Sequence, residues 1–262
     1  MPDTQKTYQK AVKKDHDYVT ILGIRVSSTP HDKLLKLVQE KLEKRQHFYI
    51  VTPNPEIIYQ AQTNPKLTHS LNSADFSLPD GVGLKLAAKN LQIIKGRNFM
   101  LDLFDWANTH KRKIYLFGST KDVIKKSLAK ISKEYGDIII KGESGPKFNE
   151  ECNPISEVDT SLEFDIVKEI NTFKPDLLFV ALGAPKQELW IAKWQSKLQA
   201  IGIMAVGGSL DYYSEKVKPV PGPIEYLNLE WLWRLIQEPR RLGRIVDAFI
   251  LFPIQVFREK YH

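Results

Sequence analysis

The segment KIYLFGSTKDVIKKSLAKISKEYG (Lys113–Gly136) joins an apolar strand to an amphipathic helix. The strand KIYLFG leads directly into Ser119 and Thr120, two residue types that cap helix N-termini. The apolar residues that follow recur at helical spacing. This pattern predicts a strand–helix unit, the building block of a parallel sheet.

The same alternation of strands and helices extends in both directions from this unit. A pair of short strands is expected in Tyr18–Ser28, before a helix capped by Thr29 with Pro30 in its first turn. Further strands are expected in residues 47–52, 75–81, 137–142, 176–183 and 201–208, and helices in residues 55–64, 162–173 and 185–198. We therefore predict an α/β fold with a mostly parallel sheet and helices on both faces.

The amino-acid composition of the chain changes after Gly208. A proline-rich loop (residues 214–223) leads into a segment that mixes tryptophan and phenylalanine with arginine, as in helices that lie at a lipid headgroup interface. Its longest apolar run, residues 245–257, is interrupted by polar residues and is shorter than the ~20 residues of a membrane span. We predict a flexible tail (1–17), an α/β domain (18–210) and a helical C-terminal appendage (211–262).

Composition narrows the classes of partner. The 262 residues carry a net charge of +7, which indicates an anionic partner such as a nucleotide, a nucleic acid or an acidic lipid. The only cysteine, Cys152, excludes an internal disulfide. The single cysteine also fits a reducing compartment, so a cytoplasmic location is expected. The polar, lysine-rich start does not resemble a secretory signal.

Polar residues follow several predicted strands, at the edge where open parallel sheets bind ligands. Thr52 and Asn54 follow one strand and Asp80 follows the next. From the residues alone, Asp80 either caps a helix or meets a substrate hydroxyl, and Thr52 and Asn54 either open a helix or contact a ligand. Gly118–Thr120 is a further candidate of this kind.

The segment Gly183–Glu188 brings a glycine-containing loop close to the same edge. Gln187 and Glu188 offer hydrogen bonds in the first helical turn, although an ordinary strand–helix turn explains the pattern equally well. Arg97 after Gly96 either contacts phosphate or is an exposed arginine at a helix start.

Several of these segments, taken in order, resemble the WecG/TagA/CpsF glycosyltransferases over nearly all of the chain beyond residue 18. The segments are TPNPEIIYQAQ, LPDGVGL, GRNF, LFGST, LGAPKQELW, VGGSLD and LEWLWRLIQEPRRL. The resemblance implies a Rossmann-like catalytic domain that binds a UDP-sugar without a metal ion or other cofactor. It also implies that the appendage meets the membrane and helps to complete the active site.

The resemblance further assigns roles to individual residues. Asp80 matches the proposed general base, and Asp211 matches a residue of the nucleotide pocket. Thr52, Asn54, Gln187 and Glu188 match substrate-binding positions. In the appendage, we expect Arg234, Arg240, Arg241 and Arg244 to meet the acceptor diphosphate or the membrane.

One segment departs from the family pattern. Where members usually carry Arg-Ala-Pro, this chain has Pro219-Val220-Pro221 after Lys216-Val217-Lys218. We therefore expect that an arginine for the donor or the acceptor phosphate is lost here and that Lys216 or Lys218 compensates for it.

The resemblance implies transfer of N-acetylmannosamine, with inversion, from UDP-N-acetylmannosamine to undecaprenyl-diphosphate-linked N-acetylglucosamine. This reaction would serve wall teichoic acid or exopolysaccharide synthesis at the inner face of the cell membrane. The motifs do not separate this donor from UDP-linked N-acetylmannosaminuronic acid, glucuronic acid or glucose. Formation of a homo-oligomer also stays open.

Other classes fit less well. Nucleic-acid binding is disfavoured because the arginines concentrate among apolar anchors in the appendage. An NAD-dependent oxidoreductase is disfavoured because no G-x-G-x-x-G follows a strand. Asp15-His16-Asp17 lies in the tail and is expected to be a solvated charge run rather than a metal site. A non-catalytic protein that binds UDP-sugars at the membrane stays open.

Overall fold

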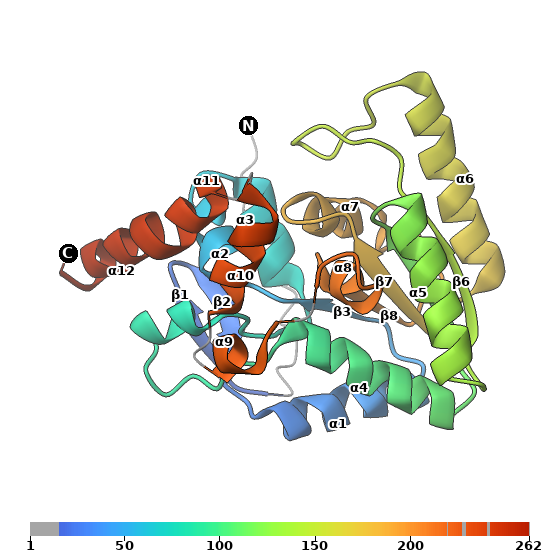
Figure 1. Ribbon diagram of the computed structural model, residues 1–262, viewed down its shortest axis with the longest axis horizontal. Coiled ribbons are helices and arrows are strands. Elements are labelled where there is room, and N and C mark those ends of the chain that lie inside the picture. The colour runs from blue at the N-terminus through green and yellow to red at the C-terminus, as the bar shows by residue number, and fades with distance from the viewer. Residues whose placement is uncertain (1–15, 219, 227–228, 240–241, 262) are drawn as a thin grey trace, which may run out of the picture.

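A six-stranded parallel sheet forms the centre of the computed structural model, which describes residues 16–218, 220–226, 229–239 and 242–261 (Figure 1). The strand order is β4-β3-β8-β7-β5-β6, and each neighbouring pair runs parallel. The strands are β3 (Phe48–Val51), β4 (Phe76–Ser77), β5 (Lys113–Gly118), β6 (Ile139–Glu143), β7 (Leu177–Ala181) and β8 (Gly202–Ala205). The predicted α/β fold with a mostly parallel sheet is confirmed.

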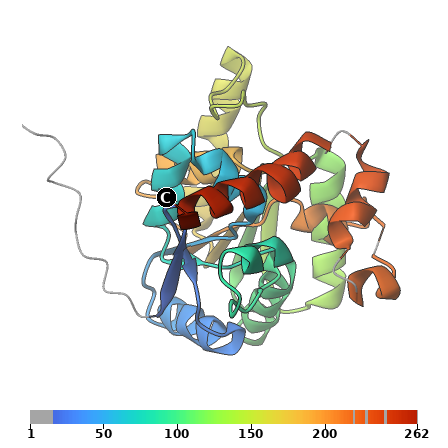
Figure 2. The same cartoon turned by 90° about the vertical axis from the view of Figure 1, so that its left-hand side faces the viewer.

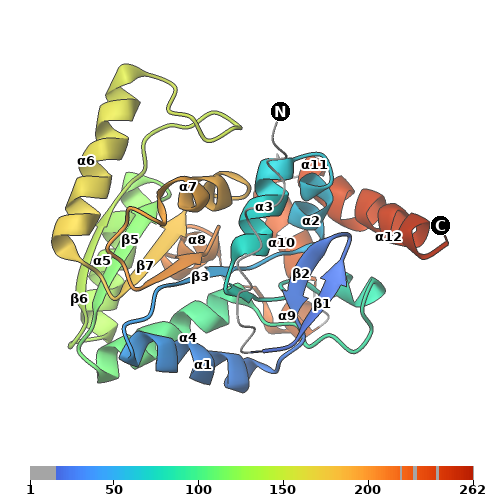
Figure 3. The same ribbon diagram turned by 180° about the vertical axis from the view of Figure 1, so that it is seen from behind.

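Helices cover both faces of this sheet, as predicted, because successive strand residues point to opposite sides. Tyr115 and Phe117 join the core beneath one helical layer, whereas Ile114 and Leu116 join the core beneath the other. The first layer contains α2 (Pro55–Ala61), α3 (Pro65–Ser73), α6 (Glu157–Phe173) and α7 (Lys186–Trp194). The second contains α1 (His31–Glu43), α4 (Gly96–Thr109), α5 (Lys121–Glu134) and α8 (Ser209–Tyr213) (Figure 3).

The N-terminal strand pair forms a sheet of its own. β1 (Tyr18–Ile21) and β2 (Ile24–Ser27) pair antiparallel and are not part of the central sheet. His16, which the sequence analysis placed in the tail, stacks on Phe76 with ring centroids 5.0 Å apart. The described part of the chain is therefore packed against the fold from its first residue.

Two predicted helix starts were wrong. The residue before α1 is Pro30, and Thr29 does not cap the helix because its hydroxyl accepts a hydrogen bond from the Asp17 amide (3.0 Å). α6 begins at Glu157 rather than Leu162, since Ser156 caps it by accepting from the Asp159 amide (3.1 Å). The spacing of apolar residues did not indicate this start, because the first turn of α6 is polar.

The C-terminal segment is helical, as predicted, and packs against α2 (Figure 2). Phe252 and Val256 are buried in the same core cluster as Ile57 and Ile58 of α2. No helix within the described ranges is both long and apolar enough to span a bilayer. The segment contains α9 (Gly222–Tyr226), α10 (Glu230–Gln237), α11 (Leu242–Val246), the π-helical turn η3 (Asp247–Leu251) and α12 (Phe252–Tyr261).

Candidate active site

A polar pocket of about 610 Å³ lies beyond the carboxyl ends of the strands. It is there because the loops after parallel strands converge at one edge of the sheet. Most candidate residues line it, but Gly118 and Lys218 do not, and Arg240 and Arg241 lie outside the described residues. These lining residues are Thr52, Asn54, Asp80, Arg97, Gln187, Glu188, Asp211, Arg234 and Arg244.

Asp80 lies in the turn after β4, where its backbone amide donates to the Pro53 carbonyl (3.0 Å). Burial, followed by the negative charge of Glu230, raises the pKa of Asp80 to about 6. A backbone hydrogen bond from Gly96 and the charges of Lys95 and Arg97 act in the opposite direction. Near neutral pH, Asp80 is therefore an ionised carboxylate that has a much higher proton affinity than a solvated aspartate.

Thr52 and Asn54 form the wall next to Asp80. Asn54 caps α2, because its side-chain oxygen accepts from the Ile57 amide (2.9 Å). Thr52 packs so close to Gly96 that a Cβ atom at position 96 would lie 2.8 Å from the Thr52 methyl carbon. Glycine at position 96 therefore allows the backbone of α4 to approach both Thr52 and Asp80.

Gln187 and Glu188, in the first turn of α7, are both buried. The Gln187 side chain accepts from the Gly207 amide (2.9 Å) and donates to one carboxylate oxygen of Glu188 (2.8 Å). The other Glu188 oxygen has no hydrogen-bond partner among the described residues. Burial raises the pKa of Glu188 to about 7. An unpaired, buried carboxyl oxygen is costly, so a ligand that bonds to it would be stabilised.

Asp211 connects the core to the C-terminal segment. It accepts from the Ser119 hydroxyl (3.3 Å) and from the guanidinium of Arg234 in α10 (3.1 Å). Tyr212 lies beneath two guanidinium groups, that of Arg97 at 5.2 Å and that of Arg234 at 5.0 Å from the ring centroid. Such cation–π contacts are attractive, and here they hold two cations from distant segments in one pocket wall.

Lys216 and Lys218, the two lysines before Pro219, differ in position. Lys216 lines the polar pocket, with its ammonium 3.5 Å from the Asp211 carboxylate. Lys218 instead uses its backbone amide and carbonyl to bond Gln237 and Trp233. Lys216 therefore lines the polar pocket and Lys218 does not, whereas Pro219 lies outside the described residues.

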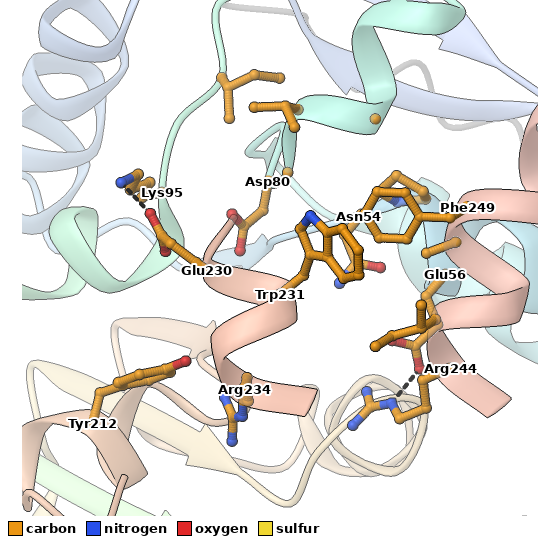
Figure 4. Close-up of a pocket in the computed structure, with 17 residues that line it drawn as sticks. Asn54, Glu56, Asp80, Lys95, Tyr212, Glu230, Trp231, Arg234, Arg244 and Phe249 are labelled. Carbon is orange, nitrogen blue, oxygen red and sulfur yellow. Dashed lines mark hydrogen bonds and ion pairs between the residues drawn. The ribbon is translucent and has the colours of Figure 1, made fainter. Parts of the chain in front are cut away.

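Several pocket residues were missed by the sequence analysis, among them Glu56, Lys95, Tyr212 and Glu230. Glu56 could have been found, because it lies in the first turn of a helix after a strand, as Glu188 does. Lys95 and Glu230 form an ion pair between segments far apart in the chain (Figure 4). Tyr212 acts through cation–π contacts. No local sequence pattern signals these last two arrangements.

A second, smaller pocket of about 300 Å³ adjoins the first. The two share Asp80, Arg234 and Arg244, so the aspartate lies where they meet. Within the part of the chain that the structure describes, no group of three or more His, Cys, Asp and Glu side chains is arranged to hold a metal ion.

Comparison with known proteins identifies the family. Residues 19–262 match the model of the glycosyl transferase WecG/TagA/CpsF family. A Bacillus subtilis protein is 37% identical over 203 residues, which cover 76% of this chain and 75% of that protein. A Bacillus spizizenii protein is 33% identical (79% and 77% covered), and a Staphylococcus aureus protein is 29% identical (87% of each).

All three relatives bear the name N-acetylglucosaminyldiphosphoundecaprenol N-acetyl-beta-D-mannosaminyltransferase. The family match covers the core, the polar pocket and the C-terminal helices together. The chain therefore belongs to the WecG/TagA/CpsF family and is a glycosyl transferase.

Proposed function

We propose that the enzyme transfers N-acetylmannosamine from UDP-N-acetylmannosamine to undecaprenyl-diphosphate-linked N-acetylglucosamine, with inversion and without a metal ion. The names of the relatives support the transferred sugar and the acceptor. The polar pocket, which is rich in cations and in glycine-containing loops, supports a nucleotide-sugar donor.

The observation that carries this proposal is the position of Asp80 where the two pockets meet. With the donor in the polar pocket, an acceptor hydroxyl that enters from the other pocket lies beside this carboxylate. Asp80 removes the hydroxyl proton as the oxygen attacks the anomeric carbon, and the bond between that carbon and the diphosphate breaks. The UDP leaves, and attack from the opposite face inverts the anomeric centre.

The departing diphosphate needs positive charge in place of a metal ion. Arg97, Arg234 and Lys216 supply it in the polar pocket. Ser119 and Thr120 line the pocket at the start of α5, whose N-terminus adds a partial positive charge. The negative charge of the leaving diphosphate is therefore stabilised by several groups at once.

The C-terminal segment is proposed to act as an appendage that meets an anionic membrane from the cytoplasmic side. Ile250, Ile254 and Phe257 are exposed apolar residues on η3 and α12. Apolar side chains of this kind bury in the headgroup region of a bilayer, where a lipid-linked acceptor would be reached. We also propose that the α/β domain ends at residue 210 and that the appendage begins at residue 211.

The test is a transfer assay with UDP-N-acetylmannosamine and a lipid-diphosphate-N-acetylglucosamine analogue, with the other UDP-sugars as competing donors. Asp80→Asn is compared with Asp102→Asn, which changes an aspartate that pairs with His31 outside both pockets. We expect Asp80→Asn to lose about 10²- to 10⁴-fold in rate and to keep UDP binding, because it removes the base alone. Asp102→Asn should retain activity.

Native turnover in the Asp80→Asn variant would overturn the assignment of the base. Transfer of another sugar in preference would replace the donor but keep the mechanism. Binding of UDP with no transfer from any donor would show a non-catalytic protein.

A further inference from the structure

The smaller pocket is apolar at the end away from Asp80. Val82 of η1 (Val82–Leu86) and Ile93 form its core side. Trp231 of α10, together with Ile245 and Phe249 from α11 and η3, forms its C-terminal side. Its apolar walls thus come from two parts of the chain that are far apart in sequence.

Two aromatic rings dominate this apolar end. Trp231 and Phe249 lie side by side with ring centroids 4.3 Å apart (Figure 4). Phe249 is still 41% exposed and Val82 37% exposed. Large apolar side chains left open to water in a concave site favour an apolar ligand.

The other end of the same pocket is charged, with the cations of Lys95, Arg234 and Arg244 beside the carboxylates of Glu56, Asp80 and Glu230. Arg234 and Arg244 lie on the boundary with the polar pocket, and Lys95 also lines both. A ligand that fills the smaller pocket therefore meets a carboxylate and guanidinium groups at one end and aromatic and aliphatic walls at the other. This order fits an amphiphile with an anionic head and an apolar chain.

We propose that the apolar end of this pocket binds the isoprenyl units next to the diphosphate of the acceptor, so that the enzyme recognises the lipid as well as the sugar. The inference rests on the proposed function for the identity of the acceptor. Arg244 then meets the acceptor diphosphate, while Trp231 and Phe249 contact the first isoprenyl units.

A nucleobase is a poorer occupant of the apolar end. Its polar edges need hydrogen-bond partners when they are buried, and Val82, Ile93 and Phe249 have no polar side-chain atoms. The polar pocket, with Gln187 and Asp211, provides such partners. The polar pocket therefore suits the nucleotide of the donor, and the smaller pocket suits the lipid of the acceptor.

The inference is tested by binding rather than by turnover. Farnesyl diphosphate, methyl diphosphate and N-acetylglucosamine 1-phosphate are titrated into the full chain by calorimetry, below the concentration at which farnesyl diphosphate forms micelles. We expect farnesyl diphosphate to bind at least about tenfold more tightly than methyl diphosphate, because only the former buries apolar surface.

Phe249→Ser should abolish this preference and leave the affinity for methyl diphosphate unchanged. Phe257→Ser is the matched control, since Phe257 is 58% exposed on α12 and does not line the pocket. This variant should keep the preference. Retained folding of both is checked by their thermal unfolding.

Equal affinities of the native chain for the two diphosphates would overturn the inference. So would a Phe249→Ser variant that loses only N-acetylglucosamine 1-phosphate, since the pocket would then hold the sugar. A chain that binds farnesyl diphosphate as expected but transfers no sugar would support the lipid pocket and overturn the proposed reaction instead.

Discussion

Arg244 of α11 forms an ion pair with Glu56 in the first turn of α2, across 188 positions of the chain. The Glu56 side chain is 11% exposed and that of Arg244 36% exposed, and both line the polar pocket and the smaller one. The guanidinium that we assign to a phosphate is therefore held by a carboxylate in this structure. Substrate binding would require a phosphate to share or displace that partner.

Arg234 is held in the same way, by Asp211, and a third pair joins Lys95 to Glu230. Each pair connects the core with the C-terminal segment at a residue that lines a pocket. The C-terminal helices thus dock through residues that also line the site.

Exchanging the charges of the first pair should separate its two roles. Arg244→Glu alone places a second carboxylate beside Glu56, and we expect losses of both stability and activity. Adding Glu56→Arg should recover about 1–3 kcal/mol of unfolding free energy, measured in urea, because the attraction is restored. Activity should stay low, since the arginine now projects from α2. Recovery of full activity would show that the pair is only structural.

The acid limb of the pH–rate profile should follow Asp80. Because the pKa of Asp80 is about 6, kcat/KM should rise as the pH increases from 5 to 7 and the carboxylate ionises. Glu230→Gln should move this limb to lower pH, since Glu230 raises the Asp80 pKa and its loss also releases the opposing charge of Lys95. Glu215→Gln, which alters an exposed pair with Lys130, is the control. A limb that does not move would contradict the assignment.

Asp80 should reduce stability at neutral pH. Its pKa is raised from 3.8 to about 6 in the folded state, so its ionisation costs stability as the pH rises through 6. Asp80→Asn removes this cost, and we expect about 1–3 kcal/mol of added unfolding free energy at pH 7.5. The gain should nearly vanish at pH 4, where the native carboxyl is protonated. Urea unfolding at both pH values measures the difference, and an equal gain at both would refute this origin.

Gly208→Ala should displace Arg234. A Cβ atom at position 208 would overlap the Arg234 guanidinium, which cannot move away without loosening its pair with Asp211. We expect transfer to fall by about tenfold, the equivalent of about 1.4 kcal/mol of lost stabilisation. Gly222→Ala is the matched control, because a Cβ atom there meets nothing within 4 Å. Similar rates in the two variants would show that Arg234 does not need this contact.

A chelator should leave the rate unchanged within about twofold, because cationic side chains and helix N-termini take the role of a metal ion at the diphosphate. The assay is run with and without EDTA, followed by addition of magnesium or manganese. A large loss that either ion restores would refute the metal-free mechanism.

Much of the fold was predictable because its signals are local. The strand Lys113–Gly118 was predicted with the bounds that it has in the structure, since its apolar run ends at a glycine and a cap. α2 starts at Pro55, as predicted, because proline suits the first helical turn. The start of α6 was missed because a polar first turn carries no apolar period, and only the Ser156 cap marks it.

The candidate site was predictable to the extent that its residues follow strands. Thr52, Asn54 and Asp80 line one pocket because the carboxyl ends of parallel strands meet at one edge. Asn54 shows that the alternatives were not exclusive, since it caps α2 and lines the pocket as well.

The sequence by itself determined most of the alternation of strands and helices, although not α3 and α4, and the polar residues at the strand ends, because helix and strand periods and caps act over a few neighbouring residues. Only the tertiary structure decided that Arg234 and Arg244 reach Asp211 and Glu56, that Trp231 and Phe249 form the wall of a second pocket, and that Lys216 rather than Lys218 faces the first. These contacts join segments far apart in the chain, and their geometry depends on how the C-terminal helices pack on α2, which no local pattern encodes.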